Sequence, residues 1–251
     1  RPRVRRPLMS RRLLVLALIL VAIAPFVPLL VNGEVPLLRD HRDYFVPLRH
    51  FTALELSEGR VPLWNPYNGS GEPWLANPQT ATFYPPAYLF VAFPFAFAYV
   101  AYLALHVALL AVGSFFLFVR RSTPAAAALG AVAVALSGPV FSMLDVGNNL
   151  TTFAWIPATL ACALARRDAE PRWPRAVLGV MLALIFLGGE PFLAAIGWAA
   201  VAVALLTGRF RRGALDAAVT FVIALLLSAA QLLPFLAMLR GSDRASGLGA
   251  D

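Results

Sequence analysis

The chain has 251 residues, of which 60% are hydrophobic and only 14% are charged, and its mean hydropathy is +0.73. A soluble globular protein carries about 25% charged residues, so this composition excludes a protein whose whole surface faces water. The net charge of +8 does not indicate nucleic-acid binding, because all 21 basic residues are arginines, mostly in short clusters between apolar runs. That pattern is typical of the positive-inside rule of membrane proteins.

The first apolar run covers residues 13–31 and follows the arginine-rich segment 1–12. It is long enough to cross the hydrocarbon core of a bilayer at 1.5 Å per residue. Ala22 and Ala24 resemble a signal-peptidase site, but Pro25 directly after them disfavours cleavage. We therefore predict an uncleaved first span with a cytoplasmic N-terminus. Because the chain opens at Arg1, Met9 is a candidate for its natural start.

Residues 32–86 form a long polar stretch that we expect to lie outside the cell. Within it, the apolar periodicity of residues 44–56 predicts a short amphipathic helix on the membrane surface. The following segment, 62–84, is rich in Pro, Asn, Gly and aromatic residues. It is too aromatic for a disordered segment, and long loops that are ordered are usually functional.

Six further spans are predicted after this loop, at 95–119, 124–143, 150–165, 176–188, 191–206 and 214–239. The apolar run 176–206 is too long for one helix in a bilayer core of about 30 Å. Two helices joined by a turn at 188–191 also place the arginines of 209–212 on the cytoplasmic side. The predicted fold is an all-α, polytopic transmembrane bundle of about seven spans in a single domain.

This arrangement separates the charged residues by sign. The arginine clusters 11–12, 120–121, 166–167 and 209–212 fall on the cytoplasmic side. Most of the acids fall outside: Glu34, Asp40, Asp43, Glu55, Glu58, Glu72, Asp145, Glu190, Asp243 and Asp251. The orientation rule counts mainly Lys and Arg, so the gathering of acids is a separate observation, and it predicts a polar site on the outer face.

Short motifs occur in a fixed order along the outer segments. They are Asp40 seven residues before Pro47, G-R-x-P-L-W-N-P at 59–66, L-A-N-P-Q at 75–79, F-Y-P at 83–85, S-G at 137–138, a Gly-x-Pro turn at 189–191, Q-L-L-P at 231–234 and S-x-R at 242–244. Together they resemble the bacterial YfhO family of membrane proteins over nearly the whole chain. One departure is visible, since the turn commonly reads Gly-His-Pro-Gln in that family and here carries Glu190 and Phe192.

The resemblance implies a GT-C type glycosyltransferase in the bacterial cytoplasmic membrane. Such enzymes move a sugar from a polyprenyl-phosphate carrier to an envelope glycan or lipid acceptor on the outer face. Asp40 occupies the position of their essential acid in the first outer loop. Glu190 is a second candidate catalytic acid on other grounds, because an ionisable group within an apolar run is costly and tends to be functional. Family members are usually longer, so the resemblance also implies that this chain is an N-terminal fragment.

The residue types in the outer segments suit that chemistry. Transfer from a lipid phosphate needs a base at the acceptor hydroxyl and cations near the departing phosphate. Candidate phosphate ligands are Arg39, Arg42, Arg240 and Arg244; candidate faces for a sugar ring are Trp64, Tyr67, Trp74 and Tyr84; candidate hydroxyl partners are Asn65, Asn77, Gln79 and Gln231. Asp40, Asp43 and Glu190 are also candidate ligands of a divalent cation, Mg²⁺ or Mn²⁺.

Each of these residues also has an ordinary structural interpretation. Asp40 beside arginines can be a solvated surface pair, and Trp and Tyr near an interface can form an aromatic belt. Gln231 and His106 lie within apolar helices, where they can bond a neighbouring helix. At the level of function, a transporter or lipid flippase is the alternative, followed by a membrane scaffold. The identity of the sugar and of the acceptor stays open.

Overall fold

The computed structural model describes residues 10–36, 39–168, 174–207 and 210–242, and the side chains of Phe210 and Arg211 are not described. Across these ranges the regular structure is helical. A single β-bridge, between Asn65 and Glu72, is described outside the helices. The expected all-α fold is therefore confirmed for the described part of the chain.

The elements follow one another in this order: α1 (Arg11–Ile23), η1 (Ala24–Phe26), α2 (Val27–Asn32), η2 (His41–Phe45), α3 (Val46–Ser57), η3 (Pro78–Thr80), η4 (Pro85–Tyr88), α4 (Leu89–Ala92), α5 (Phe95–Phe118), α6 (Pro124–Ala135), α7 (Gly138–Asp145), α8 (Gly147–Phe153), α9 (Ile156–Arg167), α10 (Arg175–Leu187), α11 (Pro191–Leu206) and α12 (Phe210–Arg240).

The N-terminal helix is continuous from Arg11 to Asn32 through α1, η1 and α2, where the sequence predicts a span over 13–31. Ser10 caps its start by accepting a hydrogen bond from the backbone of Leu13. Gly33 ends it in the left-handed conformation with a φ of 68°, a conformation that costs glycine little.

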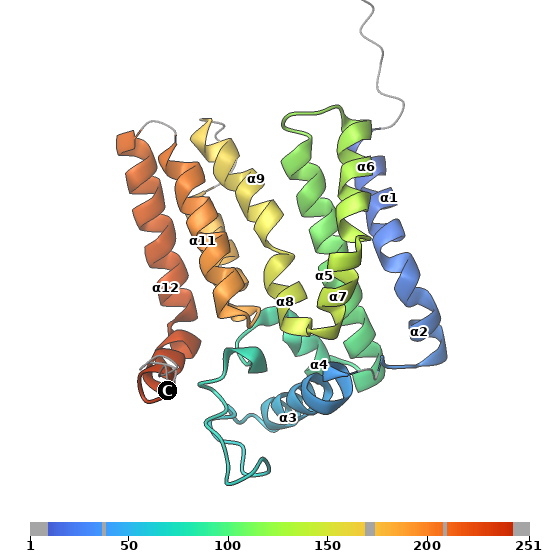
Figure 1. Cartoon of the computed structure of the whole chain (residues 1–251), viewed down its shortest axis with the longest axis vertical. Coiled ribbons are helices and arrows are strands. Elements are labelled where there is room, and N and C mark those ends of the chain that lie inside the picture. Colours follow the sequence, from blue (N-terminus) through green and yellow to red (C-terminus); the bar gives the residue numbers. More distant parts are fainter. Residues whose placement is uncertain (1–9, 37–38, 169–173, 208–209, 243–251) are drawn as a thin grey trace, which may run out of the picture.

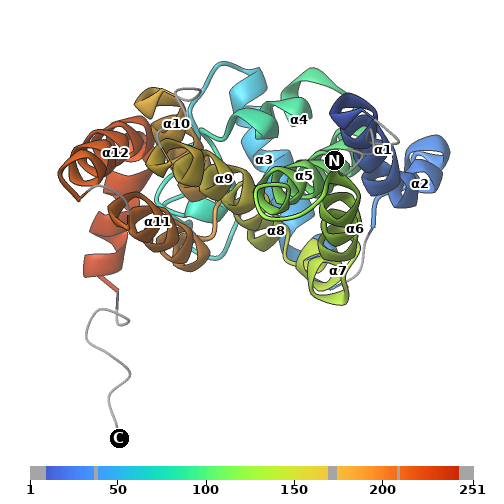
Figure 2. The ribbon, with the colours of Figure 1, turned by 90° about the horizontal axis from the view of Figure 1, so that it is seen from above.

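The helix α5 lies at the centre of the fold and contacts α1, α6, α8 and α9. Figure 2 shows α1 and α12 at opposite ends of the assembly, with α5, α8 and α9 between them. The crossing of α5 and α9 is close, because a β-carbon on Gly113 would lie 2.8 Å from the backbone nitrogen of Ala158. Small residues allow this approach, as is common where helices pack in membranes.

Two of the predicted spans are broken in the structure. The span expected at 124–143 consists of α6 and α7, which meet at an angle of 40° beside Leu136 and Ser137. The span expected at 150–165 consists of α8 and α9, with Pro157 in the first turn of α9. Proline fits the first turn of a helix but not its interior, so each break coincides with a proline that starts a new helix, Pro139 in α7 and Pro157 in α9.

The run 176–206 forms two helices, α10 and α11, as the length argument predicts. The turn between them has Gly189 at a φ of 104°, which is unfavourable for other residues. Glu190 caps α11, since its carboxylate accepts a hydrogen bond of 2.6 Å from the backbone of Leu193.

Three described helices are long and apolar enough to cross a membrane: 11–32, 95–118 and 212–240. The bent pair of α6 and α7 is a fourth if it counts as one span, and α10 and α11 are apolar but shorter. The chain thus has the helices of a membrane protein.

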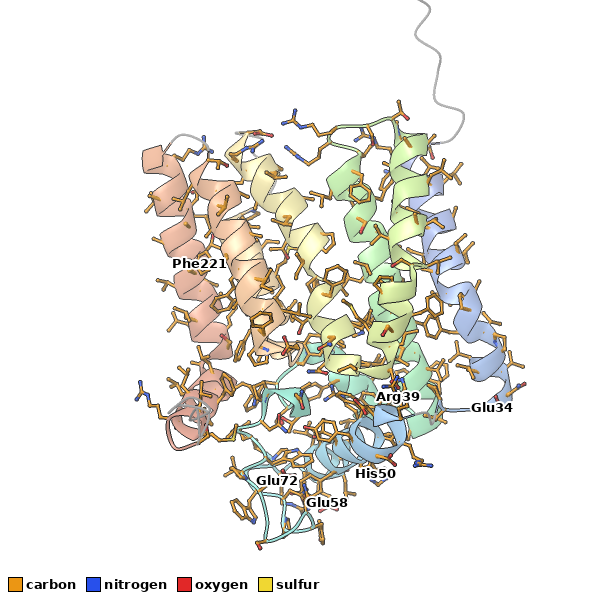
Figure 3. The ribbon with its side chains drawn as sticks, viewed as in Figure 1. Glu34, Arg39, His50, Glu58, Glu72 and Phe221 are labelled. Carbon is orange, nitrogen blue, oxygen red and sulfur yellow. The ribbon has the colours of Figure 1, made fainter. Side chains whose placement is uncertain are left out.

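The long helices lie side by side with their connections at two opposite ends (Figure 1). At one end lie the start of α1 and the C-terminal ends of α5, α9 and α11; we call it the arginine end, because Arg12, Arg120, Arg121, Arg166 and Arg167 belong to it. At the other end, which we call the loop end, residues 33–94 fold against the bundle with α3 and α4. Figure 3 shows His50, Glu58 and Glu72 there, with Arg39 closer to the bundle.

Candidate functional site

The loop end contains a cavity of about 310 Å³ between the α3 region and the segment that follows it. Its lining residues come from η2, α3 and residues 65–74: Asp43, Tyr44, Pro47, Leu48, Phe51, Asn65, Tyr67, Asn68, Glu72 and Trp74. Four residues that the sequence analysis selected as separate candidates thus line one cavity: Asp43, Asn65, Tyr67 and Trp74.

A tight turn supplies the polar wall of this cavity. The backbones of Asn65 and Glu72 exchange two hydrogen bonds of 2.9 Å, and the side chain of Asn65 accepts a third from the backbone of Tyr67. The turn between them needs Gly69 and Gly71, which have φ values of 55° and 93°. The local sequence N-P-Y-N-G-S-G-E therefore folds back on itself and presents its amides and carboxylate together.

The aromatic wall combines one buried ring and one exposed ring. Trp74 is 4% exposed and donates a hydrogen bond of 2.9 Å from Nε1 to Oγ1 of Thr52. Phe51 packs edge-on against Trp74 and against Tyr67, with ring centroids 4.8 Å and 6.1 Å apart. Tyr67 itself is 84% exposed, so its ring is available to a ligand at the cavity mouth.

Two carboxylates face this cavity. Asp43 pairs with Arg42 at 2.7 Å, and that hydrogen bond holds the pKa of Asp43 below its usual value. Glu72 accepts hydrogen bonds from the side-chain amides of Asn68 and Asn65 at 3.0 Å and 3.4 Å. Ionised carboxylates accept hydrogen bonds and amides both donate and accept them, which is the set of partners that a polyhydroxyl ligand needs.

Asp40 lies at the first turn of η2, outside the lining of this cavity, and is exposed. Its neighbours hold the turn on the bundle. Arg39 has a φ of 49° and lies 3.3 Å from the carboxylate of Asp145 at the end of α7. His41 is buried and hydrogen-bonds the hydroxyl of Tyr99 at 2.7 Å. Burial lowers the pKa of His41, although Asp145 and Asp40 oppose that effect.

Asn77 and Gln79 form a network with Tyr44 in the wall of the cavity. The Tyr44 hydroxyl donates to Gln79 at 2.6 Å and accepts from the Asn77 amide at 2.9 Å. The buried guanidinium of Arg49 donates to the backbone oxygens of Gln79 and Thr80, both at 2.8 Å. These contacts fix the 77–80 segment and make Tyr44 part of its support.

Gln231 lies within α12, is 1% exposed, and donates from its amide to the backbone oxygens of Leu75 and Asn77. Tyr84 is fully buried, where its hydroxyl hydrogen-bonds His106 at 2.6 Å and accepts from the Trp155 indole at 2.7 Å. Both residues were candidates for contact with substrate, and in the structure both bind other parts of the chain.

The remaining candidates are dispersed. Glu190 caps α11 at the end of the turn after α10, and a β-carbon on its neighbour Gly189 would lie 3.0 Å from the backbone oxygen of Pro78. Trp64 is 53% exposed beside Gly71, outside the cavity lining. Arg240 is exposed in the last turn of α12, and Arg244 lies outside the described residues.

The sequence analysis did not single out Tyr44 or Asn68 and counted Glu72 only among the outer acids. Asn68 and Glu72 flank Gly69 and Gly71, so a turn that presents them together could have been inferred from the glycines. Tyr44 had no such signal, because its role depends on contacts with residues more than thirty positions away.

Among the described side chains, no group of three or more His, Cys, Asp or Glu residues is placed to hold a metal ion. Asp40, Asp43 and Glu190 come from two different parts of the loop end, the first two from the η2 turn and the third from the start of α11.

Comparisons of the chain with protein-family models, with curated proteins and with solved structures found no match.

Proposed function

We propose that this protein is a membrane glycosyltransferase that moves a sugar from a polyprenyl-phosphate carrier to an acceptor at the loop end. The observation that carries the proposal is the cavity of about 310 Å³ with aromatic, amide and carboxylate walls. Small-molecule sites have volumes of about 300–1,000 Å³, so the cavity suits a ligand the size of one sugar unit.

The wall chemistry supports a carbohydrate ligand. The ring of Tyr67 offers a flat apolar face, and Asn65, Asn68, Asp43 and Glu72 offer donors and acceptors for hydroxyl groups. A flippase must carry a polar headgroup across the bilayer and would need polar groups along the helices of the bundle, whereas these groups lie together at the loop end.

In the proposed reaction, an acceptor hydroxyl oxygen attacks the anomeric carbon of the carrier-linked sugar. The bond between that carbon and the phosphate oxygen breaks, and the polyprenyl phosphate leaves with the electron pair. Asp40, exposed one turn before Asp43, accepts the hydroxyl proton, and the guanidinium groups of Arg39 and Arg42 balance the phosphate charge. Arg240 is a further phosphate ligand in this scheme.

The proposal includes a topology of seven spans, with the arginine end in the cytoplasm of a bacterium and the loop end outside. Within the described ranges, seven helical segments run between the two ends if α6 with α7 and α8 with α9 each count as one, which supports this topology. Arginine-rich connections favour the cytoplasmic side.

The activity test measures loss of labelled sugar from polyprenyl-phosphate carriers in membranes that contain the full-length protein. We expect Asp40→Asn to lower the rate by about 100-fold or more, the usual contribution of a general base. Asp43→Asn should mainly raise KM, by about tenfold for one lost hydrogen bond to the sugar. The control is Glu58→Gln, which changes an exposed acid of the same region that pairs with Arg60.

Equal consumption by the wild type and Asp40→Asn would remove Asp40 as the base. No consumption of any common carrier-linked sugar would favour the alternative function, a transporter or lipid flippase. The observation in favour of that alternative is the row of buried polar side chains inside the bundle, including His106, Thr151 and Thr159.

The topology test uses cysteine labelling. The chain has a single natural cysteine, Cys162, which is buried. It is replaced by alanine, and one new cysteine at a time is then introduced at Ser70, Ser122 or Thr207. A membrane-impermeant maleimide applied from outside should label Ser70→Cys only. In the proposed topology Ser122 is one crossing away from the loop end, and Thr207 is on the same side as Ser122 because four crossings separate them. Labelling of Ser122→Cys or Thr207→Cys from outside would contradict seven spans.

A further inference from the structure

A second cavity, of about 560 Å³, lies at the arginine end, opposite the candidate sugar site. Its walls come from the end of α5, the α5–α6 turn, the start of α6 and the end of α9: Leu117, Phe118, Arg120, Arg121, Ser122, Ala126, Gly130, Leu164 and Arg167. Three arginines and several apolar side chains thus line one space.

The charge of this cavity is strongly positive. Arg120 and Arg167 share the carboxylate of Asp168, at 2.6 Å and 2.8 Å. These bonds lower the pKa of Asp168, with that to Arg167 the larger cause. Arg121 adds a third guanidinium that is exposed and forms no ion pair within the described part of the chain. The exposed guanidinium of Arg121 can therefore bind an anion at this cavity.

The remaining lining of the cavity is largely apolar and belongs to the helices of the bundle. Leu117 and Phe118 belong to α5, and Leu164 to α9. Gly130 on α6 leaves room for the ring of Phe118, because a β-carbon there would lie 3.2 Å from that ring. A ligand that fits both parts has an anionic head and an apolar body.

We propose that this cavity binds an anionic phospholipid, with its phosphate between Arg121 and Arg167 and its acyl chains along α5, α6 and α9. A basic pocket between membrane helices at the cytoplasmic surface is a recognised form of headgroup site. The start of α6 contributes, since a helix N-terminus favours a negative charge. This inference does not depend on the proposed glycosyltransferase activity, which belongs to the opposite end.

Native mass spectrometry of the detergent-purified protein tests the proposal. The probes are phosphatidylglycerol and phosphatidylcholine with identical acyl chains. We expect one tightly bound phosphatidylglycerol, and at least tenfold weaker binding for phosphatidylcholine. The double variant Arg121→Gln/Arg167→Gln should lose that preference. The matched control is Arg12→Gln, which removes one charge from an exposed arginine at the same end but outside the cavity.

A second variant, Ala126→Leu, keeps all three arginines and narrows the cavity at an exposed lining position. It should also weaken phosphatidylglycerol binding, while the melting temperature stays within a few degrees of the wild type. Equal binding by the wild type and both cavity variants would overturn the proposal, as would an equal loss in Arg12→Gln. Displacement of the lipid by millimolar inorganic phosphate would assign the site to a free anion instead.

Discussion

At the arginine end, Asp216 of α12 is 2% exposed and accepts hydrogen bonds from Arg166 and Arg175 at 2.9 Å and 2.6 Å. At the loop end, Asp43 and Arg42 pair with more than 60% of each side chain exposed. The first contact connects three helices, α9, α10 and α12. The second connects two adjacent residues of the chain.

Hydrogen bonds to the backbone hold the loop end together instead. Gln231 and Arg49 donate to four backbone oxygens of the 75–80 segment, and no carboxylate takes part in these contacts. The carboxylates of Asp43 and Glu72 can therefore face the cavity. The comparison teaches that Asp216 stabilises the bundle through a buried contact, whereas Asp43 and Glu72 are available for binding.

Replacement of Asp216 should have the largest effect on stability. Asp216→Asn leaves the charges of Arg166 and Arg175 without this buried carboxylate, and loss of one partner from a buried pair costs about 3–5 kcal/mol. The measurement is unfolding in detergent. The control, Asp43→Asn, changes the exposed acid of the loop end and should leave the free energy of unfolding nearly unchanged. Equal losses would break the distinction between the ends.

Replacement of Gln231 should loosen the 74–80 segment without unfolding the helical bundle. Gln231→Leu removes the donor to Leu75 and Asn77, at a cost of about 1–3 kcal/mol for the buried carbonyls. Hydrogen exchange should accelerate over residues 74–80. Ser228→Ala is the control, because the Ser228 hydroxyl bonds only Ala224 of its own helix. Unchanged exchange in Gln231→Leu would show that the segment is held by other contacts.

The turn of the cavity wall can be probed by two glycines. A β-carbon at Gly71 would collide with the Trp64 indole, whereas one at Gly69 meets no atom within 4 Å. Both positions have positive φ, which costs other residues about 1–2 kcal/mol. Gly71→Ala should therefore lower stability by about 1–2 kcal/mol more than Gly69→Ala, the range typical of overpacking. Equal losses would mean that the indole can move away at no cost.

The smallest expected effect is a dependence of the free energy of unfolding on pH. Burial lowers the pKa of His41 in the folded protein below its ordinary value of 6.5. Below about pH 6.5 the unfolded chain therefore binds more protons than the folded one, and stability falls as pH falls, by at most about 1.4 kcal/mol per pH unit. Unfolding at pH 7.5 and 5.5 should show a smaller fall in His41→Gln than in the wild type. An identical fall would assign the titration to another group.

Composition and periodicity alone determined the helical class and the main helices. The helices 11–32 and 95–118 lie within a few residues of the predicted spans, because a bilayer demands long apolar runs that are visible in the sequence. The division of 176–206 into α10 and α11 followed from length and from the arginines of 209–212. The kind of residue needed at the loop end was also visible, since acids, amides and aromatics cluster between 39 and 85.

Only the tertiary structure decided which of those residues share a cavity. Asn65 and Tyr67 line it with Asp43, while Tyr84 and Gln231, which have equally suitable side chains, are buried against other parts of the chain. Sequence could not separate the two groups, because an amide or a phenol hydrogen-bonds a backbone oxygen or a histidine as well as it does a sugar. The partner depends on long-range packing, and local spacing does not encode that packing.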